Sequence, residues 1–287
     1  DLHGEGHSFP TRRSSDLILL LAASLAGYGA VQYFRDGRQE LLAFVALMIG
    51  IALWQFTNVL RDLFTDLSVK IQVLHVFLVV VIPLFGYSLL WFALAYSDAS
   101  QRRIRVVGGL FFAEILVIGT GIALNPEFLQ TVDGIVYQGP VTVMNLTFEE
   151  WAVLDRTFRT TASIRQSYHY VIWIISGAIL VRYSLQHQSK VALGQVIALV
   201  IGIGATVVVS GLLFLGLLPA EQAFTGLALG VLAVCSAIAV FRYRMLDLAT
   251  VGRQEFVEEM DDPLVFQNDE NEIVYSNPRA REVFEVG

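Results

Sequence analysis

The chain has 287 residues, 55% of them hydrophobic and 16% charged, and its mean hydropathy is +0.61. Soluble domains contain about 25% charged residues, so this composition excludes an ordinary soluble domain and indicates a membrane protein. The net charge of −7 and the two lysines argue against the basic surface that nucleic-acid binding requires, and the single cysteine, Cys235, excludes an intrachain disulfide.

Residues 1–16 lack the long apolar runs of the remaining chain. The segment Ser8–Leu17, with the sequence SFPTRRSSDL, matches the in-frame translation of a common sequencing-library adapter. The alternative is a signal peptide or a basic leader, but acidic residues and the lack of a small-residue cleavage site argue against it. We therefore expect residues 1–16 to be a non-native leader and the natural sequence to begin near Leu17, inside its first helix.

The rest of the chain contains seven long apolar stretches. Most reach, without an internal charge, the roughly 20 residues that cross the hydrocarbon core of a bilayer, and the fifth reaches that length only with its flanks. Seven crossings place the two chain ends on opposite sides of the membrane, as in a sensor that passes a signal inward. We predict an all-α polytopic membrane protein, a seven-transmembrane helix bundle over residues 17–244. The stretches are Leu17–Phe34, Leu41–Leu60, Ile71–Tyr96, Ile104–Leu124, Tyr168–Val181, Val191–Leu218 and Ala223–Phe241.

Arginine placement orients these helices, because short cytoplasmic loops collect Lys and Arg. The loops after the first, third and fifth stretches, and the end of the seventh, carry such residues without many acids. The short loops on the other side are acidic or balanced. The sequence therefore predicts a cell-membrane protein with its N-terminus outside and its C-terminus in the cytoplasm. The residues on the cytoplasmic side are Arg35, Arg38, Arg102, Arg103, Arg105, Arg182, Lys190, Arg242 and Arg244.

The longest loop, over residues 125–167, is predicted to lie outside. Gly134–Tyr137 and Val141–Met144 predict two short strands around a turn. Thr147, followed by two glutamates, predicts a short capped helix over Thr147–Trp151. The loop is either a lid over the helix ends or a surface that contacts a ligand, because loops that merely connect helices are usually shorter.

One ionisable residue lies deep in the apolar sequence. Glu114 is near the centre of the fourth stretch, where a charge is costly and marks a functional site by default. Glu114 is interpreted as a protonatable switch, a ligand contact or the counter-charge to His75 in the third stretch. The alternative is a neutral carboxyl group hydrogen-bonded to a neighbouring helix, and His75 would then be an interfacial or hydrogen-bonded histidine.

A second candidate region lies near the outer ends of the second and third stretches. The polar residues there would line an outward-facing pocket, although hydrogen bonds between helices explain them nearly as well. The glycines of the sixth stretch, Gly202, Gly204, Gly211 and Gly216, are interpreted as close-packing positions. We predict no metal site, because the other histidines of the bundle lie at helix ends facing opposite sides. The pocket candidates are Trp54, Gln55, Asn58 and Gln72.

The tail begins with residues 245–260, which are predicted to form a juxtamembrane helix. Met245, Leu248, Val257 and Met260 would form a narrow apolar seam, but two heptads are too few to identify a coiled coil. The segment is either a plain helix or a signalling helix that pairs across a dimer. The expected relay residues are Arg242, Arg244, Met245 and Leu248.

Residues 261–287 predict a hairpin and then a helix. Pro263–Gln267 and Glu272–Ser276 are the expected strands, joined by a turn that contains Asp269. Asn277 is the expected N-cap and Pro278 the first helical residue. This pattern resembles the opening of a PAS domain. Only the beginning of such a domain is expected here, too short to bury a core of its own.

The whole arrangement resembles the seven-helix N-terminal sensor region of archaeal and bacterial histidine kinases. The resemblance implies the sensory input module of a two-component system: a homodimer in the lipid bilayer that acts on a response regulator through a kinase core outside this chain. It implies no catalytic residue and no cofactor in this fragment. The matching features are Leu53-Trp54, Pro83, Asn125-Pro126 and Phe241–Leu248, together with the PAS-like start.

Two alternatives stay open. The same sensor could drive another output, such as a diguanylate cyclase, which only downstream sequence would reveal. A transporter-like helix bundle would predict internal repeats and interrupted helices in two halves. An odd number of helices and no evident repeat count against it. The seventh stretch contains no lysine, which excludes a retinal Schiff base.

Overall fold

The computed structural model describes residues 10–64, 66–138, 141–143, 146–148, 151–187, 190–214, 217, 221–242, 260–267 and 273–284. The chain divides into two compact units, Asp1–Tyr243 and Arg244–Gly287. The juxtamembrane helix predicted over residues 245–260 lies almost entirely outside the described residues.

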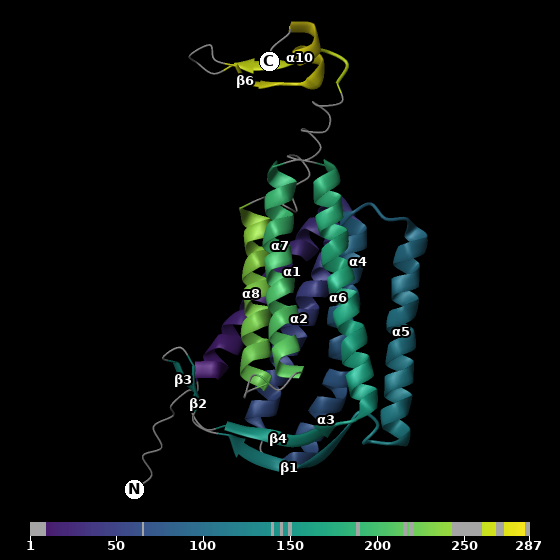
Figure 1. Cartoon of the computed structure of the whole chain (residues 1–287), viewed down its shortest axis with the longest axis vertical. Coiled ribbons are helices and arrows are strands. Elements are labelled where there is room, and N and C mark those ends of the chain that lie inside the picture. Colours follow the sequence, from purple (N-terminus) through teal and green to yellow (C-terminus); the bar gives the residue numbers. More distant parts are fainter. Residues whose placement is uncertain are drawn as a thin grey trace. The chain divides into compact units, whose positions relative to one another are not determined.

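The first unit is a bundle of long helices (Figure 1). A helix occupies each of the seven apolar stretches, and the third is formed by α3, the π-helical segment η1 and α4 in succession. The first helix begins at Pro10, inside the expected leader. The helices are α1 (Pro10–Asp36), α2 (Gln39–Leu63), α3 (Leu67–Val76), η1 (Phe77–Val81), α4 (Ile82–Tyr96), α5 (Gln101–Leu124), α6 (Thr160–His187), α7 (Lys190–Phe214) and α8 (Glu221–Phe241).

Among the described residues, six helices are long and apolar enough to cross a membrane. The helix at the fifth stretch, α6, has 28 residues but is not one of the six, in line with the weak apolar signal there. Large apolar side chains on the outer faces of the helices are exposed, such as Leu110, Phe112 and Leu116 of α5. Exposed apolar surface on this scale marks contact with lipid, so the chain is a multi-pass membrane protein.

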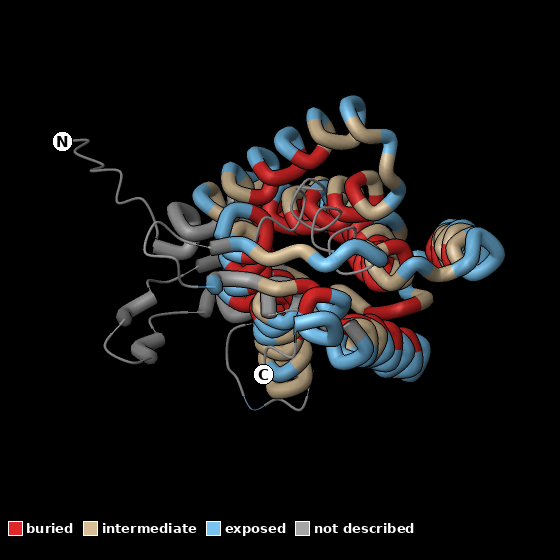
Figure 2. Tube along the Cα trace, turned by 90° about the horizontal axis from the view of Figure 1, so that it is seen from above, coloured by how far each residue is buried: buried red, intermediate tan, exposed pale blue. Residues whose placement is uncertain are grey.

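Six helices form a closed ring, and α5 stands beside it. Around the ring, α1 packs on α2, α2 on α4, α4 on α6, α6 on α7, α7 on α8, and α8 on α1. The principal contacts of α5 are with α4 and η1. Figure 2 shows buried residues on the inward faces and exposed residues outside. The core is largely aromatic where α2, α4 and α6 meet, with Phe44, Phe85, Phe92 and Trp173 almost fully buried.

The long loop between α5 and α6 folds into two antiparallel ladders, β1 with β4 and β2 with β3. The two predicted strands are present, although each pairs with a later strand and not with the other, and the helix predicted over Thr147–Trp151 is wrong. Thr147 lies in β3 opposite Thr142, because ladder pairing satisfies backbone groups that a single isolated turn of helix would leave open. The loop is also shorter than predicted, since α6 begins at Thr160. The strands are β1 (Gln130–Gln138), β2 (Val141–Val143), β3 (Leu146–Phe148) and β4 (Trp151–Phe158).

The second unit contains the predicted hairpin and helix: β5 (Val265–Gln267), antiparallel to β6 (Ile273–Ser276), and α10 (Pro278–Phe284). Asn277 is fully buried, and its Oδ1 accepts hydrogen bonds from the backbone N–H groups of Ala280 at 2.8 Å and Leu264 at 2.9 Å. Its amide also donates to backbone carbonyls of the segment before β5. The predicted N-cap is therefore present, and it also ties the hairpin to the helix.

Asn277→Ala should loosen this unit by about 1–2 kcal/mol, because two backbone N–H groups lose their acceptor. Asn277→Asp keeps both acceptor bonds and loses the two amide donations, so its effect should be smaller. Amide hydrogen exchange at Ala280 and Leu264 measures the difference. Equal exchange rates in the two variants would contradict a capping role for Oδ1.

Candidate functional site

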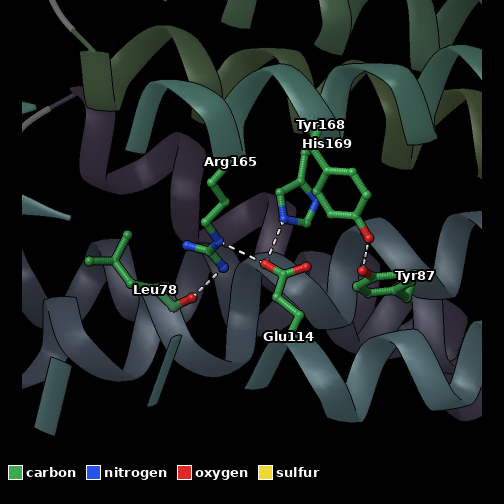
Figure 3. A network of polar contacts seen from close by, with 6 residues as sticks. All are labelled: Leu78, Tyr87, Glu114, Arg165, Tyr168 and His169. Atoms are coloured by element: carbon green, nitrogen blue, oxygen red, sulfur yellow. Dashed lines mark hydrogen bonds and ion pairs between the residues drawn. The ribbon is translucent and has the colours of Figure 1, made fainter. Parts of the chain in front are cut away.

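The buried charge predicted at Glu114 lies in an ionic cluster between α5 and α6 (Figure 3). The side chain of Glu114 is 9% exposed, and one oxygen, Oε1, accepts two hydrogen bonds. Arg165 donates through Nε at 2.7 Å, and His169 Nε2 lies at 2.9 Å. The other oxygen, Oε2, is buried and has no partner among the described residues.

The two partners of Glu114 share one face of α6, because residues four apart lie above one another on a helix. The side chains of Arg165 and His169 are 8% and 1% exposed. Neither was predicted as a site residue. His169 was placed at a helix end and Arg165 in a loop, since the fifth apolar stretch was taken to begin at Tyr168. Their spacing of four residues, together with a buried acid elsewhere, was the signal that could have identified them.

His169 also packs against α4. A Cβ added at Gly86 would lie 2.8 Å from His169 Nδ1, so glycine is what allows the imidazole to approach the α4 backbone. Next to it, the hydroxyl groups of Tyr87 and Tyr168 form a hydrogen bond between α4 and α6. Nδ1 of His169 has no partner among the described residues, which favours the tautomer with the proton on Nε2, donated to Glu114.

The guanidinium of Arg165 has a second partner. Its Nη2 donates to the backbone carbonyl of Leu78 at 2.6 Å. Leu78 belongs to η1, where the N–H of Ile82 bonds to the carbonyl of Phe77, five residues back. The next residue, Pro83, has no N–H, so no backbone donor remains for the carbonyl of Leu78. Arg165 supplies the missing hydrogen bond from another helix.

His75 is not the counter-charge of Glu114, since Arg165 takes that place and His169 lies beside it at hydrogen-bond distance. The half-buried imidazole of His75 interacts instead with the backbone of Pro126, in the turn after α5. It therefore joins the third helical segment to the turn at the C-terminal end of α5. This contact matches the hydrogen-bonded alternative for His75.

The structure places the four pocket candidates on different surfaces. Trp54 packs edge-on against Phe77, with ring centroids 4.8 Å apart, and Asn58 accepts a hydrogen bond from Arg61. Gln55 is buried on another face of α2 and donates to the carbonyl of Gly226 on α8 at 3.3 Å. Gln72 is exposed on α3. Gln55 thus forms a hydrogen bond between two helices, which matches the alternative to a pocket for this residue.

The relay candidates are only partly described. Arg242 directly follows α8, is exposed, and its N–H bonds to the carbonyl of Ile238 at 2.9 Å. Arg244, Met245 and Leu248 lie outside the described residues, as does Asp269 of the PAS-like turn. Within the described ranges, no group of three or more His, Cys, Asp or Glu side chains could hold a metal ion.

The cluster is chemically a carboxylate shared by a guanidinium and an imidazole inside an apolar bundle. Such a group can bind or release a proton, and each change alters the charge balance between two helices. A sequence model of the N-terminal 7TM region of histidine kinases matches residues 17–249, which cover the helices that form this site. No match is found among curated proteins.

Proposed function

Because the chain belongs to the family of N-terminal 7TM regions of histidine kinases, we propose that it is the sensory input module of a two-component receptor. The module crosses the membrane seven times and passes a stimulus through α8 to cytoplasmic residues beyond Arg242. The family match and the apolar helices support a membrane-embedded input region. The buried cluster around Glu114 is the observation that carries a sensing role, because a bundle that only spanned the membrane would not need it.

In this proposal α6 is the remaining crossing. Its 28 residues extend over about 42 Å, which exceeds the roughly 30 Å of the hydrocarbon core. Arg165 and His169 lower its apolar character, but both side chains turn toward Glu114 inside the protein. The polar side chains of Arg165 and His169 are therefore compatible with a position of α6 in the membrane.

The proposed orientation rests on the arginines. The turns from α1 to α2, α4 to α5 and α6 to α7 lie at the same end of the bundle as the end of α8, opposite the β1–β4 hairpin (Figure 1). This end would face the cytoplasm under the positive-inside rule. The residues that support it are Arg35, Arg38, Arg102, Arg103, Arg105, Arg182 and Arg242.

The output is proposed from the resemblance of the tail to a PAS domain. The capped hairpin and helix within residues 260–267 and 273–284 fit the opening of such a domain, which would receive the signal and pass it to a kinase core. The receptor would act as a homodimer and phosphorylate a response regulator. No cofactor is proposed for these residues.

The first experiment is to sequence the locus on both sides of the chain and to assay the encoded protein in lipid nanodiscs for autophosphorylation with labelled ATP. We expect Glu114→Gln to change the autophosphorylation rate about fivefold or more, the lower range for coupling between distant sites. The control is Glu127→Gln, which removes an exposed carboxylate that pairs with Arg159. It should leave the rate unchanged.

A diguanylate cyclase domain after the PAS-like segment would keep the sensor and replace the kinase. A second, repeated bundle at the locus would favour the transporter alternative. If a kinase is present and Glu114→Gln behaves like the control, the cluster is structural and the sensing role of this site fails.

A further inference from the structure

We propose that Glu114 is a proton-binding site, and that its protonation state sets the helical register of the segment α3–η1–α4. Only the effect of the register on signalling rests on the proposed function. The proton-binding site and the helical register can both be tested without a kinase. A π-helical turn inside a membrane helix is uncommon and is often found at functional positions. The register depends on which donor the carbonyl group of Leu78 accepts a hydrogen bond from.

Two registers are available to η1. In the observed π register the N–H of Ile82 bonds to Phe77, and the missing N–H of Pro83 leaves the carbonyl of Leu78 without a backbone donor. In a continuous α-helix, Ile82 would bond to Leu78, and Pro83 would leave the carbonyl of Val79 open instead. The two open carbonyls are about 100° apart around the helix.

Arg165 favours the π register, because it donates to the carbonyl of Leu78 at 2.6 Å. In the α register the carbonyl of Leu78 would already accept from the N–H of Ile82, so the bond from Arg165 would no longer satisfy an open backbone group. Glu114 in turn holds Arg165, since its Oε1 accepts from the guanidinium Nε at 2.7 Å. The negative charge of Glu114 is what makes a guanidinium that is 8% exposed stable at this depth.

The proton has a defined acceptor. Oε2 of Glu114 is buried without a described partner, whereas Oε1 is engaged twice. A proton from solution that binds Oε2 neutralises the carboxylate and leaves the charge of Arg165 uncompensated. Arg165 would then turn toward water and release Leu78, so the segment would return to the α register.

Few other ionisable groups face this site from the surrounding helices. On α6 they are Arg165 and His169, with Tyr168 beside the imidazole. On α4, Tyr87 bonds to Tyr168. Farther away, Arg61 of α2 lies over the ring of Phe77, 5.0 Å from its centroid, and His75 lies on α3. Glu114 is the acid among the groups named here, so it is the one whose protonation removes negative charge.

The register change has a route to α8. A shift by one residue turns α3 by about 100° and moves it about 1.5 Å relative to α4. Phe77, at the start of η1, would leave its edge-on contact with Trp54 of α2. The neighbouring residue, Gln55, donates to the carbonyl of Gly226 on α8. The outer half of the third segment is thereby connected to the proposed output helix.

The test uses the 287-residue chain in lipid nanodiscs, with Cys235→Ser and spin labels introduced at Gln72 on α3 and Ile164 on α6, which are both exposed. Pulsed electron paramagnetic resonance measures the distance between the labels from mildly alkaline to acidic pH. We expect a shift of several ångströms. Infrared difference spectra should include the band of a buried carboxylic acid that forms over the same pH range.

Glu114→Gln should hold the acidic-pH distance at every pH and abolish that infrared band. Glu127→Gln should behave as the unsubstituted protein. Pro83→Ala restores an N–H, so it should fix the distance while the infrared band of Glu114 persists. The proposal is overturned if the distance does not change with pH, or if Glu114→Gln still shows the change. Either result would leave the role as a kinase input module intact.

Discussion

Arg165→Met should destabilise the bundle by about 3–5 kcal/mol, the typical effect of removing one partner of a buried ion pair. The substitution leaves Glu114 with His169 alone and removes the donor to the carbonyl of Leu78. An unpaired buried charge and an open backbone carbonyl are then both left in an apolar setting. Unfolding of the purified protein in mixed micelles, monitored by circular dichroism, measures the loss.

The chain offers a matched control for this prediction. Arg159 also pairs with a glutamate, Glu127, at 2.5 Å, but its side chain is 45% exposed. Exposed pairs contribute about 0–1 kcal/mol, so Arg159→Met should have little effect. Adding Glu114→Gln to Arg165→Met should recover part of the loss, because the buried charge is removed as well. Equal effects of the two arginine substitutions would show that Arg165 is not a buried ionic partner.

Gly202→Ala should force α7 and α8 apart and cost about 1–3 kcal/mol, as overpacking of a close contact does. A Cβ at this position would lie 2.8 Å from the Cα of Leu232 and 3.2 Å from the Cβ of Cys235 on α8. Backbone cannot move aside as the end of a side chain can, so the helices themselves must shift. The same unfolding measurement applies.

Gly204→Ala is the control on the same helix, since no described atom lies within 4 Å of a Cβ added there. Alanine favours a helix over glycine by about 1 kcal/mol, so this variant should be neutral or slightly more stable. The prediction fails if Gly202→Ala is as stable as Gly204→Ala. Because α8 is the proposed output helix, only Gly202→Ala should also change the signalling of a full receptor.

Long apolar runs made most of the helices predictable, because the inward and lipid-facing sides of such helices are both apolar. The weakness of the fifth run has a physical cause, since α6 carries Arg165 and His169 into the bundle. A hydropathy pattern records these side chains as polar and does not record their partner. For the same reason the start of α6 was predicted too late, and the loop before it was predicted too long.

Glycine positions were predicted less well, because a sequence does not show which face of a helix meets a neighbour. Gly202 and Gly204 are about 200° apart around α7, so both cannot face α8. Both were expected to be close-packing positions, but only Gly202 lies in close contact with a neighbouring helix, α8. Gly211 has none within the described residues, and Gly216 lies outside them.

The candidate site was predictable in part. Depth within an apolar run was enough to identify Glu114, but its partners lie 51 and 55 residues further along the chain, a separation that no local pattern spans. The π-helical turn was beyond prediction for another reason. Pro83 indicates that a carbonyl will lack its donor, but which carbonyl depends on the donor that α6 supplies.

The separation of Glu114 from Arg165 has a consequence for how the protein is made. Membrane helices leave the ribosome in chain order, so α5 reaches the bilayer before the 51 residues that end at Arg165 have been synthesised. At about 5–20 residues per second this interval lasts about 3–10 s. During it Glu114 has neither of its hydrogen-bonding partners, and the apolar residues around it in α5 must carry the carboxyl group into the insertion machinery. Partner-free insertion favours the protonated acid, so the ion pair would form only when α6 arrives.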